Sequence, residues 1–263
     1  MRDVLRYEHK RVIVTGCASG MGRATAALLA DLGAQVQGLD YRQADVELDS
    51  FNTVDLREPA SIEHAVRAIG GKIDALFNCA GVGPTFSTLD KVKVNFIGTR
   101  YLTEQVLPLM GEGSAIASIA STAAMAWARR IPLHKQFLAA AGFDEAVRWT
   151  EANLEIVGEG YGFSKEAIVV WTLAQSQTLI KRGIRINCVL PGLTQTAMLT
   201  DQIAVTTSSE VLAGVIQPLG RPATPEEQAF PLVMMNSPAA GYLNGAALNV
   251  DGGRLALLAL RET

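Results

Sequence analysis

Short apolar runs along the chain alternate with longer stretches in which apolar residues recur every three or four positions. The short runs predict buried strands at residues 11–15, 35–39, 51–54, 73–78, 114–119, 185–190 and 246–250. The longer stretches predict helices between the strands, the clearest at residues 24–32, 89–110 and 225–235. This alternation is typical of an α/β fold with a doubly wound parallel sheet. Because no linker or repeat divides residues 1–263, we expect a single domain.

Two segments depart from this alternation. Residues 122–159 should connect a strand to a helix, but their apolar positions, such as Phe137, Leu138 and Ala141, repeat at helical spacing. The segment is too long for a bare loop, so we predict a helical insertion there. Residues 194–220 mix polar and apolar positions and contain a serine–threonine cluster at 206–209. We interpret this second segment as a lid over a substrate site.

Composition and charge narrow the function. The net charge is −3 and the pI is about 5.7, which argues against nucleic acid or an anionic membrane as a partner. No apolar run reaches the ~20 residues of a membrane span, and the charged first ten residues resemble no secretory signal. The three cysteines and three histidines follow no ligand spacing, so we expect no metal. An odd cysteine count without a disulfide framework favours the cytoplasm.

A glycine-rich turn, Gly16 to Gly22, lies between the first predicted strand and its helix. In a strand, glycine turn and helix, backbone N–H groups and the helix N-terminus can face a pyrophosphate, although a simple tight turn would have the same sequence. Asp40 ends the second strand, at about the distance expected of a carboxylate that binds an adenosine ribose. This favours NAD over NADP, whose 2′-phosphate Asp40 would repel. Arg42 leaves NADP open, because an arginine there can pair with that phosphate.

The candidate proton chemistry is carried by Tyr161 and Lys165. Their spacing of four places a phenol and an ammonium on one face of a helix. A positive charge near a phenol favours its ionised form and lowers its pKa from about 10, so that it can exchange a proton near neutral pH. Alone, the pair is equally consistent with an incidental contact on a surface helix.

Two further polar positions extend this candidate site. Ser118 lies near the carboxyl end of the fifth strand, the edge where ligands bind in open α/β sheets. We favour it over Ser121 and Thr122, because it keeps a Ser-x-Ala spacing after an isoleucine-containing strand. Asn95 lies inside a predicted helix, where asparagine is mildly unfavourable, so it indicates either a specific polar partner or an exposed position.

These motifs together resemble the short-chain dehydrogenases/reductases over essentially the whole chain. The matching pieces are Thr15-Gly16-x-x-x-Gly20-x-Gly22, Asp55-Leu56, Asn78-x-Ala80-Gly81, Asn95, Ser118, Tyr161-x-x-x-Lys165, Pro191-Gly192 and Asp251-Gly252-Gly253. The insertion before Tyr161, with residues 16–22 and 79–84, is most similar to the bacterial 3α-hydroxysteroid dehydrogenase/carbonyl reductase group. Ala117 and Ser121 depart from the family's usual serine and glycine. The resemblance implies a Rossmann-like fold.

The resemblance also implies roles for these residues. Tyr161 would be the general acid/base, and Lys165 would lower its pKa and bind the nicotinamide ribose. Ser118 would hydrogen-bond the substrate oxygen, and Asn95 would hold a water relay to Lys165. The residues implied to bind the coenzyme are Gly16, Ser19, Gly20, Met21, Gly22, Asp40, Tyr41, Asp55, Leu56, Asn78, Ala80, Gly81, Tyr161, Lys165, Pro191, Gly192, Thr194 and Thr196.

The expected reaction is NAD-dependent interconversion of a secondary alcohol and a ketone. An apolar cyclic substrate, such as a steroid or aromatic ketone, is favoured by apolar residues of the insertion and lid: Met125, Trp127, Leu193, Met198, Leu199, Ile203 and Val205. An NAD-binding regulatory protein is the alternative, but binding alone does not require the tyrosine, lysine, serine and asparagine. Related enoyl reductases space the tyrosine and lysine more widely. We expect a homodimer or homotetramer, in which Phe137 and Trp149 would pack the insertion against its own domain or a second subunit.

Overall fold

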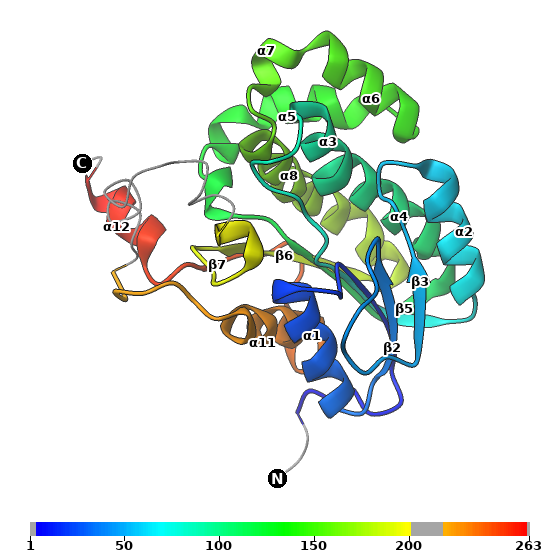
Figure 1. The fold of residues 1–263 in the computed structure, drawn as a ribbon. Helices are drawn as coiled ribbons and strands as arrows, with labels where there is room; N and C mark the ends of the chain where they lie inside the picture. The colour runs from blue at the N-terminus through cyan, green and yellow to red at the C-terminus, as the bar shows by residue number, and fades with distance from the viewer. Residues whose placement is uncertain (1–3, 201–217, 262–263) are drawn as a thin grey trace.

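The computed structural model describes residues 4–200 and 218–261. At its centre lies a parallel sheet of seven strands in the order β3-β2-β1-β4-β5-β6-β7 (Figure 1). The strands are β1 (Arg11–Thr15), β2 (Gln35–Asp40), β3 (Ser50–Thr53), β4 (Ile73–Asn78), β5 (Met110–Ile119), β6 (Arg185–Pro191) and β7 (Ala247–Val250). The strand order reverses between β1 and β4. A crevice at the carboxyl ends of the strands is expected at such a reversal.

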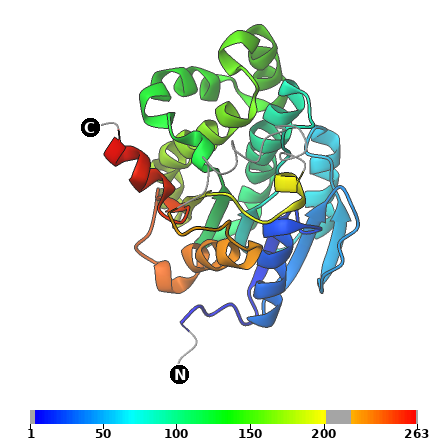
Figure 2. The same cartoon turned by 60° about the vertical axis from the view of Figure 1, so that its left-hand side comes forward.

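Helices cover both faces of the sheet (Figures 1 and 2). Helices α1 (Gly20–Asp31) and α11 (Pro225–Asn236) pack together on one face. Helices α2 (Pro59–Ile69), α4 (Thr99–Val106) and α8 (Tyr161–Leu179) cover the other, and α12 (Arg254–Arg261) follows β7. Strands buried on both faces need apolar residues at consecutive positions. The short apolar runs therefore marked the strands, and the predicted doubly wound single-domain fold is confirmed.

The helix predicted at residues 89–110 is divided. It consists of α3 (Thr88–Val92), a π-helical segment (Lys93–Gly98), α4 and a 3-10 turn (Leu107–Leu109), and Met110 already belongs to β5. Gly98 lies so close to the loop after β3 that a Cβ there would be 2.0 Å from the Leu56 carbonyl oxygen. Pro108 lacks the N–H that would continue the helix. Single π-helical turns within helices often lie at functional sites.

The segment between β5 and α8 is helical. It contains 3-10 turns at Thr122–Ala124 and Trp127–Arg130, followed by α5 (Ile131–Ala139), α6 (Gly142–Ala152) and α7 (Leu154–Val157). Phe137 of α5 is fully buried, and its ring centroid lies 4.8 Å from that of Trp149, 5.1 Å from Phe163 and 5.3 Å from Phe96. Phe137 therefore packs this segment against its own domain. The alternative expectation, that Phe137 packs against a second subunit, is wrong.

Two further 3-10 turns, Ile180–Arg182 and Pro238–Ala240, complete the described elements. Most of the predicted lid, including Ile203 and Val205, lies outside the described residues. Within residues 4–200 and 218–261, no helix has both the length and the apolar run needed to cross a bilayer.

Candidate active site

The glycine turn after β1 fits tightly against the end of β4. Gly16 has a φ of +69°, and a Cβ there would lie 2.7 Å from the Ala80 Cα. A Cβ on Gly22 would lie 2.1 Å from the Gly16 carbonyl oxygen. The Thr15 hydroxyl accepts hydrogen bonds from the Cys79 and Ala80 amides, each at 3.0 Å. Only glycine fits these two positions. The backbone N–H groups at the start of α1 therefore stay free of side chains at the edge of the sheet.

The carboxylate of Asp40 lies beside this turn and is largely buried. Its Oδ2 accepts a hydrogen bond from the Ala18 amide at 2.9 Å, and its Oδ1 accepts one from the Arg42 amide at 3.0 Å. The Arg42 guanidinium donates to the Ser19 hydroxyl at 3.0 Å and lies 5.0 Å from the centroid of the Tyr41 ring. A carboxylate suited to ribose hydroxyls and a cation suited to phosphate therefore lie at the same end of the site.

A second carboxylate, Asp55, follows β3. Arg57 donates to it from its backbone amide to Oδ1 at 2.9 Å, from Nε to Oδ1 at 3.0 Å and from a terminal nitrogen to Oδ2 at 2.6 Å. Hydrogen bonding and the charge of Arg57 hold the pKa of Asp55 below its ordinary value. Arg57 is a site residue that the sequence analysis missed. The signal was its position two residues after Asp55, which lets one side chain fold back onto the other.

Most residues predicted to bind the coenzyme line one cleft along the strand ends. These residues are Gly16, Ser19, Gly20, Met21, Gly22, Asp40, Tyr41, Asp55, Leu56, Ala80, Gly81 and Thr196. The lining also includes the apolar residues Val82, Phe86, Val94 and Met198, of which the sequence analysis named only Met198. Among the described lining residues, the predicted Asn78, Tyr161, Lys165, Pro191, Gly192 and Thr194 do not occur. Asn78 is buried, and the Thr194 hydroxyl donates to the Gly192 carbonyl.

The phenol of Tyr161 lies at the first residue of α8. Its pKa is raised, because burial disfavours the phenolate and the Glu159 carboxylate acts in the same direction, against a hydrogen bond with the Ser121 hydroxyl that lowers it. The sequence analysis expected Lys165 to lower this pKa. The net pKa is nevertheless raised, because removal of the phenol from water is the largest effect.

The role predicted for Ser118, a hydrogen bond to the substrate oxygen, stays a prediction. Ser118 is fully buried within β5, and its hydroxyl accepts a hydrogen bond from Asn78 Nδ2 at 3.2 Å. The strand continues one residue further, where Ile119 pairs with Val189 of β6. Ser121, in the turn after the strand, is therefore the serine whose hydroxyl bonds to the phenol.

Lys165 lies one turn after Tyr161 on the same helix, as its spacing predicted. Its Nζ lies 5.7 Å from the centroid of the tyrosine ring and donates to the Ile119 carbonyl at 2.8 Å. The residue is almost fully buried, and burial lowers the pKa of its ammonium to about 8. The phenol and the ammonium are thus brought to the same end of β5.

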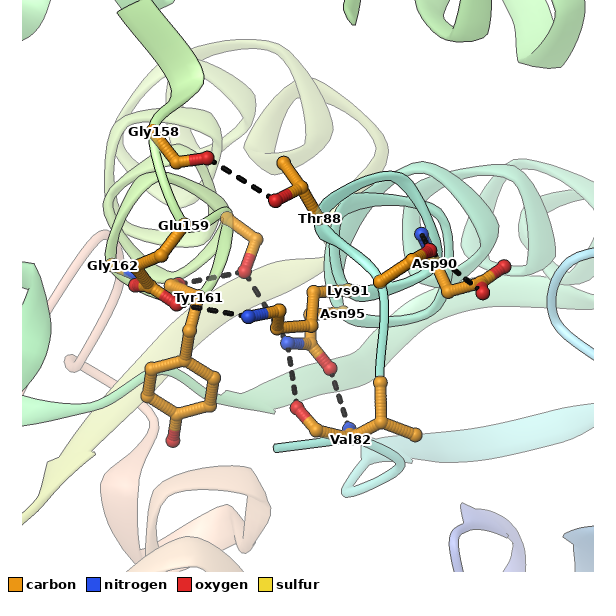
Figure 3. A network of polar contacts seen from close by, with 11 residues as sticks. Val82, Thr88, Asp90, Lys91, Asn95, Gly158, Glu159, Tyr161 and Gly162 are labelled. Carbon is orange, nitrogen blue, oxygen red and sulfur yellow. Dashed lines mark hydrogen bonds and ion pairs between the residues drawn. The ribbon is translucent and has the colours of Figure 1, made fainter. Parts of the chain in front are cut away.

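Asn95 belongs to the π-helical segment and is fully buried, which excludes the exposed alternative. Its Oδ1 accepts from the Val82 amide at 2.7 Å, and its Nδ2 donates to the Val82 carbonyl at 3.1 Å (Figure 3). A Cβ on Gly81 would lie 3.2 Å from Asn95 Oδ1 and 3.5 Å from Lys165 Nζ. Asn95, Gly81 and Lys165 therefore converge next to the cleft.

Comparison with known proteins identifies the family of this chain. Residues 10–132 match the family model described as short chain dehydrogenase, and residues 151–254 match one described as enoyl-(acyl carrier protein) reductase. The chain belongs to the short-chain dehydrogenase/reductase family, and it is an oxidoreductase of that family.

Three relatives cover almost the whole chain. A coniferyl-alcohol dehydrogenase of Pseudomonas sp. (strain HR199 / DSM 7063) is 33% identical over 95% of this chain and 98% of its own. A 3-alpha-hydroxysteroid dehydrogenase/carbonyl reductase of Comamonas testosteroni is 31% identical over 92% and 95%. The crystal structure of the 3-alpha-hydroxysteroid dehydrogenase from Pseudomonas sp. B-0831 complexed with NADH aligns with a TM-score of 0.83, at 32% identity over 96% and 99%.

Proposed function

We propose that this protein catalyses the NAD-dependent interconversion of an alcohol and its carbonyl compound, with a secondary alcohol and a ketone as the main pair. The observation that carries the proposal is the grouping of the Ser121 hydroxyl, the Tyr161 phenol and the Lys165 ammonium at the end of β5. A purely NAD-binding protein has no need of a hydroxyl bonded to a phenol beside a buried lysine.

The residues of the cleft fit a dinucleotide. The side-chain-free surface of Gly16 and Gly22 allows a pyrophosphate to approach the backbone N–H groups at the start of α1. Asp40 supplies oxygens for the adenosine ribose hydroxyls, and Asp55 with Leu56 supplies the wall for the adenine. When bound, the nicotinamide ring supplies the hydride acceptor or donor.

Residues of this chain accept the proton from the alcohol and return it in the reverse reaction. In the oxidising direction, the alcohol hydroxyl gives its proton to the Tyr161 phenolate as its carbon gives up a hydride. The Ser121 hydroxyl hydrogen-bonds the substrate oxygen, where negative charge develops. The ammonium of Lys165 lies close enough to favour the phenolate. Asn95, which bonds directly to the Val82 backbone, would hold a water relay to Lys165. Reduction reverses each step, and Tyr161 then acts as the acid.

NAD is the proposed coenzyme because the Asp40 carboxylate would repel a 2′-phosphate. Both Asp40 oxygens already accept backbone hydrogen bonds, which fix the carboxylate in place. Arg42 lies close by, so we expect NADP to bind more weakly than NAD but measurably.

The proposed substrate is uncharged, apolar and cyclic. Val82, Phe86, Val94 and Met198 form the apolar part of the cleft lining. The relatives named after coniferyl alcohol and 3-alpha-hydroxysteroids act on ring-containing alcohols. This supports steroid, alicyclic and aryl alcohols as the classes to test.

We further propose a cytoplasmic homodimer or homotetramer. The three cysteines are free thiols, as expected for a reducing compartment. Several large exposed apolar side chains, among them Phe230, Tyr242 and Leu248, lie on the C-terminal elements and on the residues between them. Exposed apolar surface of this kind is typical of a contact between subunits. Light scattering of the purified protein measures the subunit number, and a monomer would contradict the proposed assembly.

The test is absorbance at the NADH band while the enzyme meets NAD or NADP and a panel of steroid, alicyclic and aryl alcohols. We expect NADH to form with at least one class, and Tyr161→Phe to lower kcat by about 10² to 10⁴-fold, because the general acid/base is lost. Binding of NADH, followed by its fluorescence, should survive this substitution. Binding without turnover of any alcohol or carbonyl compound would favour an NAD-sensing protein.

A further inference from the structure

A buried lysine lies where the start of α8 meets α3. Lys91 is only 6% exposed, and its ammonium lies 3.2 Å from Glu159 Oε2 (Figure 3). Burial acts to raise the pKa of Glu159, but hydrogen bonds from the Gly162 and Tyr161 amides and from Lys91 bring it below its ordinary value. The carboxylate is therefore ionised at neutral pH. An ammonium removed from water needs such a counter-charge, so the pair constrains two segments far apart in sequence.

The other oxygen of Glu159 caps α8. Glu159 Oε1 accepts a hydrogen bond from the Gly162 amide at 2.8 Å. The first amides of a helix have no partner within the helix. Gly160, the residue at the N-cap position, has a φ of +88° and no side chain to accept from them. Glu159 thus does what an N-cap side chain usually does.

The chain before α8 is pressed against the start of α3. A Cβ on Gly160 would lie 2.7 Å from the Thr88 carbonyl oxygen. The Thr88 hydroxyl donates to the Gly158 carbonyl at 3.2 Å. The ion pair between Lys91 and Glu159 therefore closes a junction that is already in contact through its backbone (Figure 3).

The same junction holds Tyr161 through a second set of contacts. The Ser164 hydroxyl donates to the Tyr161 carbonyl at 2.7 Å, and Asn95 Nδ2 donates to the Ser164 oxygen at 3.3 Å. Asn95 lies one turn after Lys91 on the continuous α3 and π-helical segment. The first turn of α8 is thus fixed from this segment at two points, one ionic and one through neutral hydrogen bonds.

We propose that Lys91 is a positioning residue, which acts through Glu159 to fix the first turn of α8 and so to hold the Tyr161 phenol where proton transfer needs it. Among the described residues that line the cleft, neither Lys91 nor Glu159 occurs. In this proposal, Lys91 therefore affects the reaction only through the position of Tyr161. The kinetic consequence rests on the proposed function, whereas the structural consequence does not.

The test is Lys91→Met. Methionine fills a similar volume and leaves no unpaired buried charge, because the side chain of Glu159 is 65% exposed and can turn into water. We expect an unchanged unfolding midpoint, an unchanged Kd for NADH, and a kcat lower by about 10 to 100-fold, since a small misplacement of a reacting group is costly. Lys91→Arg should recover part of kcat, because it restores the cation.

Glu104→Gln is the matched control. It removes an ion pair with the mostly buried Arg100 on α4, away from Tyr161, and should leave kcat at the wild-type value. A second measurement does not depend on turnover: amide hydrogen exchange of peptides spanning residues 158–166, followed by mass spectrometry. We expect faster exchange in Lys91→Met than in the wild type, and no change in Glu104→Gln.

The outcomes separate the two proposals. A wild-type kcat in Lys91→Met overturns the positioning role, and so does a reduced kcat with unchanged exchange. If the wild-type enzyme turns over no substrate of the panel, faster exchange in Lys91→Met still supports the structural part and unchanged exchange overturns it. In that case the proposed function has failed separately.

Discussion

Two serines three residues apart meet different surroundings at the end of β5. Ser118 points into the interior, where it shares Asn78 Nδ2 with the Thr103 hydroxyl. Ser121 is partly exposed and bonds to the Tyr161 phenol. A hydroxyl can stabilise a developing oxyanion only if it reaches the substrate oxygen. Because Ser118 is buried and the Ser121 hydroxyl bonds to the phenol, we infer that Ser121 takes this role.

Ser121→Ala should therefore lower kcat by about 10² to 10³-fold, the usual loss for one donor to a developing oxyanion. Ser118→Ala should keep kcat and cost about 1 kcal/mol of unfolding free energy, because Asn78 Nδ2 keeps Thr103 as its other partner. Steady-state kinetics and urea unfolding of both variants measure this difference. The assignment fails if Ser118→Ala is the inactive variant.

Helix α8 faces the candidate site on one side and packs against the inserted helices on the other. Tyr161 and Lys165 face the site, while Phe163 and Glu166 face the helices inserted before α8. Glu166 is buried and accepts from Arg130 at 2.9 Å, and its Oε2 lies 2.8 Å from His134 Nε2. The inserted helices therefore support the back of α8 through aromatic rings and through these buried polar groups.

Phe137→Ala tests this support. The residue is fully buried among aromatic rings, so its truncation should lower the unfolding free energy by about 3–5 kcal/mol. Leu154→Ala, on the exposed side of the same insertion, is the control and should change it by less than about 0.5 kcal/mol. Thermal or chemical unfolding compares the two. Equal small effects would show that the insertion does not depend on its aromatic packing.

At the scale of the whole molecule, local sequence patterns predicted the fold and most of the cleft. The buried central strands required apolar runs, and the close approaches at Gly16 and Gly22 required glycine. Patterns failed where the deciding contact is long-range. The end of β5 depends on pairing with β6, which no run of residues near Ser121 reveals. Lys91 and Glu159 meet only after folding, and neither follows a periodic signal.

Long-range burial also has a consequence for stability. Lys165 is almost fully buried, and its pKa falls from 10.5 to about 8. Below pH 8 the ammonium is charged in both the folded and the unfolded chain, and the folded chain then carries the full cost of its burial. Between pH 8 and 10.5 the unfolded chain binds more protons, so stability rises with pH. The buried Lys165 therefore lowers stability most near neutral pH.

Lys165→Met should consequently be inactive but more stable than the wild type at pH 7, by about 1–3 kcal/mol. The shift in pKa sets the upper end, and the loss of the hydrogen bond to the Ile119 carbonyl reduces the gain. The advantage should shrink when pH rises from 7 to 10. Urea unfolding of both proteins at the two pH values measures it, and other titrating groups cancel in the difference. A Lys165→Met protein less stable than the wild type at pH 7 would show that the ammonium's contacts offset its burial.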